Sequence, residues 1–285
     1  MGLSMKSLKS LFISGLISLA VATVVFALWL LVSSGNLASL ALLLAAVPML
    51  VFLGWLFLGK PARTSASLPW VFWPSMLGTL AVISLFLAGH ACWLMTTLAV
   101  LNLAGVHLYI RWYSRYQQRP VVAKVGEMLP TVQFTSLENR PVTVADFAGS
   151  PVVMLFFRGN WCPLCLAQVR EVAAAYQSLQ EKGVRVALIS PQSHAQSAEL
   201  AKQFSVNFDY LRDDDNAAAR ALGILDAGGT PAGLEVLGYD SDTVMPTVLI
   251  LDAQGRLVFQ HLTDNYRIRP EPSLFIEVLE REGLI

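Results

Sequence analysis

Two cysteines three residues apart, Cys162 and Cys165, are the residues of this sequence best suited to covalent chemistry. They belong to the segment FFRGNWCPLC, which overlaps the apolar run PVVMLFF. That run has no polar residue and predicts a buried strand. Apolar residues then recur at helical spacing as far as Gly183, so both cysteines fall where a strand becomes a helix. A thiolate there faces unpaired backbone N–H groups and the positive end of the helix dipole, which lower a cysteine pKa.

The i, i+3 spacing brings both sulfurs over the first helical turn, where either can resolve an adduct on its partner as a disulfide. A structural zinc site is one alternative, but it needs four ligands. The sequence has no second cysteine pair, and His194 and His261 stand alone. A second alternative is two inert buried cysteines. We favour redox chemistry, because a CxxC pair in a β/α setting is typical of thiol oxidoreductases. We expect a redox-active Cys162–Cys165 disulfide, an external thiol reductant, no bound cofactor and no metal.

The chain that must position this pair has two unlike parts. Of its 285 residues, 55% are hydrophobic and only 14% are charged. Residues 1–126 contain no Asp or Glu, while all 20 acidic residues follow, together with 12 Lys and Arg. The neutral total therefore hides a basic apolar part and an acidic part of net charge −8. We interpret these parts as a membrane module and a domain of ordinary size for one core.

The basic part has room for four membrane-spanning helices. A bilayer core needs about 20 apolar residues in a helix, and the uncharged stretches suggest spans at about 11–32, 37–58, 68–87 and 91–110. The first could instead be a secretory signal, but its apolar run is longer than such signals have. The third contains Pro69, Pro74 and Gly78 and could be interfacial. We predict an all-α transmembrane module at 1–119 and a redox domain at 120–285.

The distribution of positive charge predicts the orientation. Lys and Arg favour the cytoplasmic side. Seven Lys and Arg residues lie before the first span, between the second and third spans, and after the fourth span, which all face the same side of the membrane. The other two turns, SSGN and GH, contain no Lys or Arg. The seven are Lys6, Lys9, Lys60, Arg63, Arg111, Arg115 and Arg119. We therefore expect a multi-pass protein, of a bacterial inner membrane, whose redox domain is cytoplasmic.

Three reactive or polar residues lie in or near the spans. We interpret Cys92 as a small apolar residue packed in a helix, and His90 and His107 as residues near interfaces or bonded to a neighbour. No set of intramembrane acids or bases suggests an ion path, so the module is expected to be an anchor.

The acidic part alternates strands with helices. Apolar runs at VRVALIS, PTVLILD and LVFQHL predict strands, and SAELAKQFS and PSLFIEVLEREG predict helices. The segment DDDNAAARALGI predicts a loop entering another helix. This alternation, with continuously apolar strands, favours an α/β sheet covered on both faces. The acidic run at 213–215 is interpreted as helix capping rather than as a metal cluster.

The segment FFRGNWCPLC resembles the active site of thioredoxin-fold proteins and, more closely, the peroxiredoxin-like branch of the alkyl hydroperoxide reductase/thiol-specific antioxidant (AhpC/TSA) family. The likeness extends to VGEMLPTVQFTSLENRPVTVADFAG before it and to VMPTVLILDAQGRLVFQHLTDNYRIRPEP near the end, covering about residues 125–272. It implies a thioredoxin-like fold. Pro246 falls where that fold has a cis-proline facing the thiols.

The resemblance leaves the attacking cysteine open. Peroxiredoxins carry Pro-x-x-x-Thr/Ser-x-x-Cys. With Cys165 as attacker, Arg158 and Cys162 occupy the proline and threonine positions. The thioredoxin analogy instead makes Cys162 the exposed nucleophile and Cys165 the resolver, and this assignment is our expectation. Arg158, and alternatively Arg267 or Arg269, are candidates to stabilise the thiolate.

We therefore expect a membrane-anchored, thiol-dependent oxidoreductase that reduces hydroperoxides through a sulfenic acid/disulfide cycle. One alternative is a protein disulfide oxidoreductase. Another is a non-catalytic redox sensor that regulates a membrane partner. The expected partners are a hydroperoxide or disulfide substrate, a thioredoxin-like or glutathione-type reductant and the lipid bilayer, with no nucleic acid.

Overall fold

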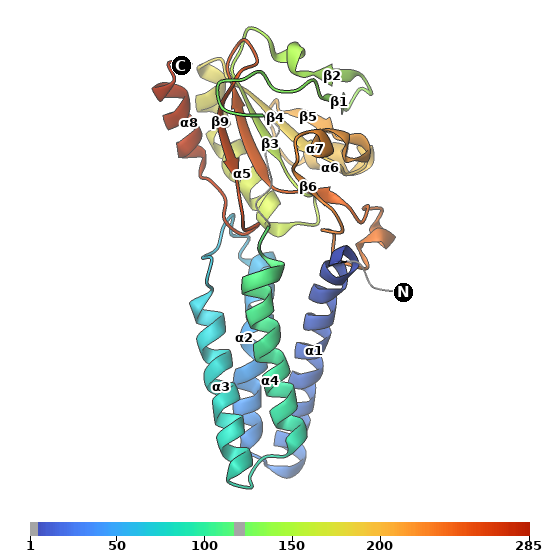
Figure 1. Ribbon diagram of the computed structural model, residues 1–285, viewed down its shortest axis with the longest axis vertical. Coiled ribbons are helices and arrows are strands. Elements are labelled where there is room, and N and C mark those ends of the chain that lie inside the picture. Colours follow the sequence, from blue (N-terminus) through green and yellow to red (C-terminus); the bar gives the residue numbers. More distant parts are fainter. Residues whose placement is uncertain (1–4, 117–122) are drawn as a thin grey trace. The chain divides into compact units, whose positions relative to one another are not determined.

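The computed structural model describes residues 5–116 and 123–285, and it divides into two compact units. Among these residues, one unit comprises 5–60 and 64–116, and the other comprises 61–63 and 123–285. In Figure 1 the first unit runs from blue to green and the second from green to red. The predicted boundary between residues 119 and 120 lies outside the described residues.

The first unit consists of four long helices followed by a short π-helical turn. They are α1 (Met5–Ser34), α2 (Ala38–Leu58), α3 (Pro69–Leu87), α4 (Trp93–Leu108) and the turn η1 (Tyr109–Tyr113). Four segments of the described chain are long and apolar enough to cross a membrane: Leu8–Ser34, Ala38–Leu58, Pro69–Leu87 and Trp93–Tyr113. The predicted number of helices is confirmed, and the two prolines of the third segment are accommodated at its first turn and inside it.

Small and polar side chains hold these helices together. A Cβ atom on Gly78 of α3 would come within 2.4 Å of the backbone N of Ala45 in α2, so glycine permits this close approach. Asn102 of α4 donates a buried hydrogen bond of 2.9 Å to the Thr23 hydroxyl of α1. The placement of Cys92 within a helix was wrong: the residue is exposed and precedes the first residue of α4, because the helix begins at Trp93.

The second unit is built on a seven-stranded mixed sheet. Its spatial order is β2-β1-β5-β4-β3-β8-β9. Strand β3 pairs in parallel with β4 and antiparallel with β8, and β4 pairs in parallel with β5. A small separate sheet joins β6 and β7. The strands are β1 (Gln133–Ser136), β2 (Pro141–Thr143), β3 (Val152–Phe156), β4 (Arg185–Ser190), β5 (Asp209–Arg212), β6 (Leu225–Asp226), β7 (Thr243–Val244), β8 (Thr247–Leu251) and β9 (Leu257–Leu262).

Helices cover both faces of this sheet, which confirms the predicted α/β class. Figure 1 shows α5 (Pro163–Glu181) and α8 (Pro272–Arg281) on one side, and α6 (His194–Lys202) and α7 (Ala217–Ala221) on the other. Short 3₁₀ turns occur at Val144–Phe147, Asp214–Asn216 and Leu234–Leu237. Every residue of the central strands β3 and β8 is buried, as expected of strands covered on two faces.

The acidic run caps a helix, as predicted. The buried carboxylate of Asp213 accepts hydrogen bonds of 2.7 and 2.8 Å from the backbone N–H groups of Ala218 and Ala219 at the start of α7. These contacts satisfy two N–H groups that have no partner within the helix. Burial raises the pKa of this carboxyl above its usual value.

Candidate active site

The cysteine pair lies at the junction of β3 and α5, where the sequence places it. Cys162 is the N-cap of α5, and Pro163 is its first helical residue, a position at which the missing proline N–H costs nothing. The backbone N–H of Cys165 donates to the Cys162 sulfur at 3.4 Å. The first turn of the helix therefore contains both thiols, with one at its cap.

Both sulfurs are buried. The exposed fraction is 2% for Cys162 and 0% for Cys165, and both are free thiols. The expectation that Cys162 is the exposed member of the pair was therefore wrong. The physical reason is that the cap is covered by buried side chains from the segment that precedes α8, chiefly Arg269, which a motif read along the chain does not show.

Arg269 reaches both thiols. Its Nη2 atom lies 3.3 Å from the Cys165 sulfur and 3.8 Å from the Cys162 sulfur. Two further bonds fix the guanidinium: Nη1 donates to Gln168 Oε1 at 3.0 Å, and Nε donates to the Tyr266 carbonyl at 3.2 Å. The side chain is only 4% exposed. A buried cation held this way stabilises an anion beside it.

The two thiols have opposite pKa shifts. Burial by itself raises the pKa of Cys165, but the hydrogen bond from the Cys162 thiol, the charge of Arg269 and the Arg158 backbone N–H lower it to about 5. Burial, together with the hydrogen bond and charge of its neighbour, raises the pKa of Cys162 well above the ordinary value. These opposite directions make Cys165 the sulfur that ionises more readily. This favours the peroxiredoxin-like register over the thioredoxin-like assignment.

Arg158 is buried beside the pair and engaged elsewhere. Its Nη2 atom lies 3.5 Å from the Asp226 carboxylate and donates to the Gly229 carbonyl. Its guanidinium lies 4.6 Å from the ring centre of Trp161 and 5.3 Å from that of Tyr266, within the range of cation–π attraction. The charge of Arg158 also favours ionisation of both thiols. The Arg158 charge acts on the two sulfurs from a distance, whereas the Arg269 guanidinium contacts both of them.

The other two residues singled out from the sequence are both buried. Arg267 is 0% exposed, and its backbone N–H donates to Asn265 Oδ1 at 3.1 Å. Pro246 precedes Thr247, which pairs with Phe156 at the end of β3 that leads into the thiol segment. No cis peptide bond occurs among the described residues. The bond before Pro246 is therefore trans, the form favoured by about 0.5–1 kcal/mol for X–Pro, and the expected cis-proline was wrong.

The sequence did not identify Gln168 or Asp226. Gln168 is 1% exposed, and its Nε2 atom has no hydrogen-bond partner in the described part of the chain. Its position three residues after Cys165, on the buried face of an amphipathic helix, is a signal that could have identified it. Asp226 is 5% exposed and comes from the small β6–β7 sheet, which no pattern in the sequence indicates.

Among the described residues, His194 and His261 form no hydrogen bond with either sulfur, and neither belongs to a group of side chains that could hold a metal ion. His194 Nε2 bonds the Leu137 carbonyl at 2.8 Å. Burial and the charge of Arg269 lower the pKa of His261, so its ring is neutral at pH 7. Among the described residues, no group of three or more His, Cys, Asp and Glu side chains could hold a metal ion.

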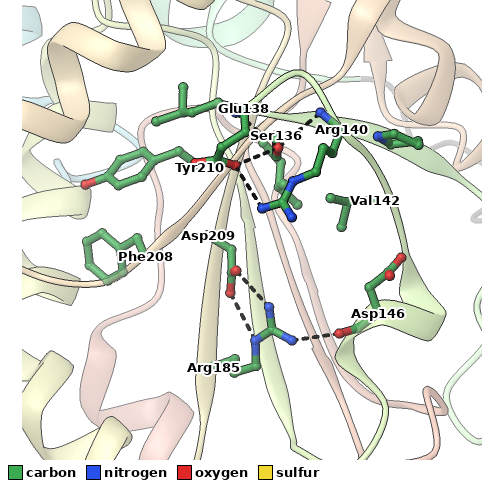
Figure 2. Close-up of a pocket in the computed structure, with 12 residues that line it drawn as sticks. Ser136, Glu138, Arg140, Val142, Asp146, Arg185, Phe208, Asp209 and Tyr210 are labelled. Carbon is green, nitrogen blue, oxygen red and sulfur yellow. Dashed lines mark hydrogen bonds and ion pairs between the residues drawn. The ribbon is translucent and has the colours of Figure 1, made fainter.

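A hollow of about 440 Å³ lies elsewhere on the domain, between the β1–β2 turn and β5. Figure 2 shows that both of its arginines point at a neighbouring carboxylate. Arg185 binds both carboxylate oxygens of Asp209, at 2.7 and 3.2 Å, and Arg140 lies 3.6 Å from Glu138. With both arginines paired and no thiol in its lining, this hollow lacks the chemistry of the cysteine pair.

Comparison with known proteins finds similarity to thiol-dependent redox proteins. Residues 125–260 match the AhpC/TSA family. Chloroplastic peroxiredoxin Q of Sedum lineare is 29% identical over 135 residues, which are 46% of this chain and 73% of that protein. Thiol-disulfide oxidoreductase ResA of Bacillus cereus is 22% identical over 155 residues, 54% of this chain and 76% of that protein. The crystal structure of Enterococcus faecalis AhpC aligns with a TM-score of 0.47 at 17% identity, covering 56% of this chain and 93% of that one.

Proposed function

Because residues 125–260 match the AhpC/TSA family, we propose that this protein is a membrane-anchored thiol peroxidase that reduces hydroperoxides. Cys165 is the attacking thiolate and Cys162 the resolving thiol. The observation that carries the proposal is the contact between Arg269 Nη2 and the Cys165 sulfur, at 3.3 Å within a buried site. Thiolates rather than thiols are nucleophilic, and the Arg269 contact favours the thiolate form of Cys165.

The reaction proceeds in two steps at the cysteine pair. The Cys165 thiolate attacks the terminal oxygen of the hydroperoxide, the O–O bond breaks, and the departing alkoxide takes a proton to become an alcohol, or water when the substrate is hydrogen peroxide. Cys165 is left as a sulfenic acid. The Cys162 thiol then attacks that sulfur, forming the disulfide and releasing water. An external dithiol supplies the two electrons and two protons that restore both thiols.

The surrounding side chains have distinct roles in this cycle. Arg269 stabilises the thiolate and the negative charge that develops on the leaving oxygen. The unpartnered Nε2 of Gln168 supplies a donor for a peroxide oxygen. Arg158 adds a second positive charge, and Pro246 shapes the wall of the site beside the end of β3.

Burial favours a small hydroperoxide over a protein disulfide as substrate. The sulfurs are 0% and 2% exposed, so the reduced pair admits hydrogen peroxide, which is little larger than water, more readily than a folded protein. A protein reductant acts on the oxidised pair, after the first turn of α5 has opened. Protein disulfide exchange is the second candidate, supported by the likeness to ResA and the CxxC spacing. The family domain and the buried pair favour the peroxidase.

The four apolar helices support insertion of the chain in a membrane. The basic residues at their shared ends support a cytoplasmic redox domain. A reporter fused to the C-terminus, active only in the cytoplasm, tests this orientation. Activity of a reporter that works only outside the cytoplasm would contradict it.

The activity is tested with the full-length chain in detergent, supplied with hydrogen peroxide, thioredoxin, thioredoxin reductase and NADPH. We expect peroxide-dependent NADPH oxidation that is lost in Cys165→Ser and retained in Cys92→Ser, a matched control because Cys92 lies in the other unit. Turnover of insulin disulfides without peroxide consumption would overturn the proposal in favour of disulfide exchange.

A further inference from the structure

A cavity of about 290 Å³ lies within the helical unit, where α3 begins and α4 ends. Its lining combines an aromatic and apolar wall with two arginines: Ala66, Ser67, Pro69, Phe72, Trp73, His107, Ile110, Arg111 and Arg115. We propose that this cavity binds the phosphate headgroup of an anionic phospholipid. The inference rests on the proposed insertion in a membrane and is independent of the redox chemistry.

The charge of the cavity calls for an anion that the helical unit does not contain. Residues 1–126 include no Asp or Glu. Arg111 and Arg115 are exposed, and neither forms an ion pair among the described residues. A third cation is close to the cavity lining, because Lys9 Nζ donates to the Arg115 carbonyl at 3.1 Å. A cluster of positive side chains with no acidic residue in its own unit attracts an anion.

The position of the cavity along the helices matches the headgroup layer. The apolar segment that contains α4 ends at Tyr113, so Arg111 and Arg115 fall at the end of a span. Trp73 lines the same cavity, and tryptophan is enriched at the membrane interface. Basic pockets between membrane helices bind lipid phosphates in this layer.

The apolar wall distinguishes a lipid from a free anion. Phe72, Trp73 and Ile110 are among the residues that line the cavity, and the ring of Phe72 lies 6.4 Å from that of His107. A soluble phosphate gains nothing from such a wall, whereas the glycerol and first methylenes of a phospholipid bury against it. The π-helical turn Tyr109–Tyr113 includes Arg111, and such turns frequently occur at functional sites.

The test uses the full-length chain in nanodiscs that contain phosphatidylcholine with a minor fraction of labelled phosphatidylglycerol, and it measures retained lipid by native mass spectrometry. We expect selective retention of phosphatidylglycerol by the unaltered chain. Arg111→Gln/Arg115→Gln should weaken retention about 30-fold, the equivalent of about 2 kcal/mol for two basic side chains at the membrane surface. Lys60→Gln/Lys124→Gln removes the same charge at two exposed lysines outside the cavity and should retain the lipid.

A second variant separates the cavity from its charge. Ser67→Trp fills the space and leaves both arginines, so it should also lose the lipid, while Arg111→Lys/Arg115→Lys should retain most of it. Equal retention by Ser67→Trp and the unaltered chain, or displacement of the lipid by inorganic phosphate alone, would overturn the inference. Failure of the chain to enter vesicles of any composition would instead contradict the proposed membrane insertion.

Discussion

The Nη2 atom of Arg269 lies 3.3 Å from the sulfur of Cys165, although the two residues are 104 positions apart. The arginine comes from the segment before α8 and the cysteine from the first turn of α5, and these two helices contact each other. The sheet and its covering helices thus bring a cation to a thiol that the helix terminus alone would stabilise only modestly. The reactivity of the pair depends on this tertiary contact as well as on the CxxC spacing.

The first prediction concerns the pH at which Cys165 reacts. In Cys92→Ser/Cys162→Ser, iodoacetamide should modify Cys165 with a midpoint well below the ordinary thiol value of about 8.5, because the serine hydroxyl replaces the thiol donor that helps lower the pKa to about 5. Cys92→Ser/Cys162→Ala removes that donor and should raise the midpoint. A midpoint near 8.5 in the serine variant would contradict the assignment. Stopped alkylation reactions read by mass spectrometry give both curves.

The second prediction concerns Arg269. A hydrogen bond to a charged group contributes about 1.5–3 kcal/mol, so Arg269→Gln should raise the pKa of Cys165 by about 1–2 units and slow peroxide reduction. Arg269→Lys keeps the charge without the planar guanidinium, so its Cys165 pKa should lie between those of the unaltered chain and Arg269→Gln. Arg256→Gln is the matched control, because Arg256 is exposed. The same alkylation curves measure the shift. An unchanged midpoint in Arg269→Gln would contradict a role of this arginine in stabilising the Cys165 thiolate.

The third prediction concerns the buried ion pair of Arg158 and Asp226, whose side chains are 5% and 7% exposed. Asp226→Ala leaves the arginine charge buried without this carboxylate and should lower the free energy of unfolding by about 3–5 kcal/mol. Adding Arg158→Met removes the charge and should recover much of the loss. Denaturant unfolding of the full chain in detergent measures both.

The control for this pair is Asp240→Ala, since Asp240 is exposed. It should change the stability by less than about 0.5 kcal/mol. If Asp226→Ala proved equally mild, Arg158 would be compensated by its other contacts, and the pair would have no structural importance.

The parts of the fold that the sequence predicts are those with strong local patterns. Continuous apolar stretches predict the four helices and the strands β3, β4, β8 and β9, because few other structures suit such a composition. Strand β5 (Asp209–Arg212) was missed because its four residues are half polar, and β6 and β7 have two residues each. Such short strands form through pairing with neighbours rather than through their own propensity.

The site divides in the same way. Local sequence places Cys162 and Cys165 at a helix start, because a strand, a proline and an amphipathic helix follow one another there. It does not determine which sulfur is ionised, since that depends on Arg269, on the Arg158 backbone and on burial, all set by tertiary structure. Asp226 is absent from any motif for the same reason.

Trapping the sulfenic acid shows which sulfur attacks peroxide, and the proposed mechanism assigns that attack to Cys165. Full-length Cys162→Ser and Cys165→Ser chains are treated with equimolar hydrogen peroxide and a 1,3-dione, and the labelled cysteine is identified by mass spectrometry. We expect rapid labelling of Cys165 in the first variant and none of Cys162 in the second. Rapid labelling of Cys162 in Cys165→Ser, with no label on Cys165 in Cys162→Ser, would show that Cys162 and not Cys165 attacks the hydroperoxide.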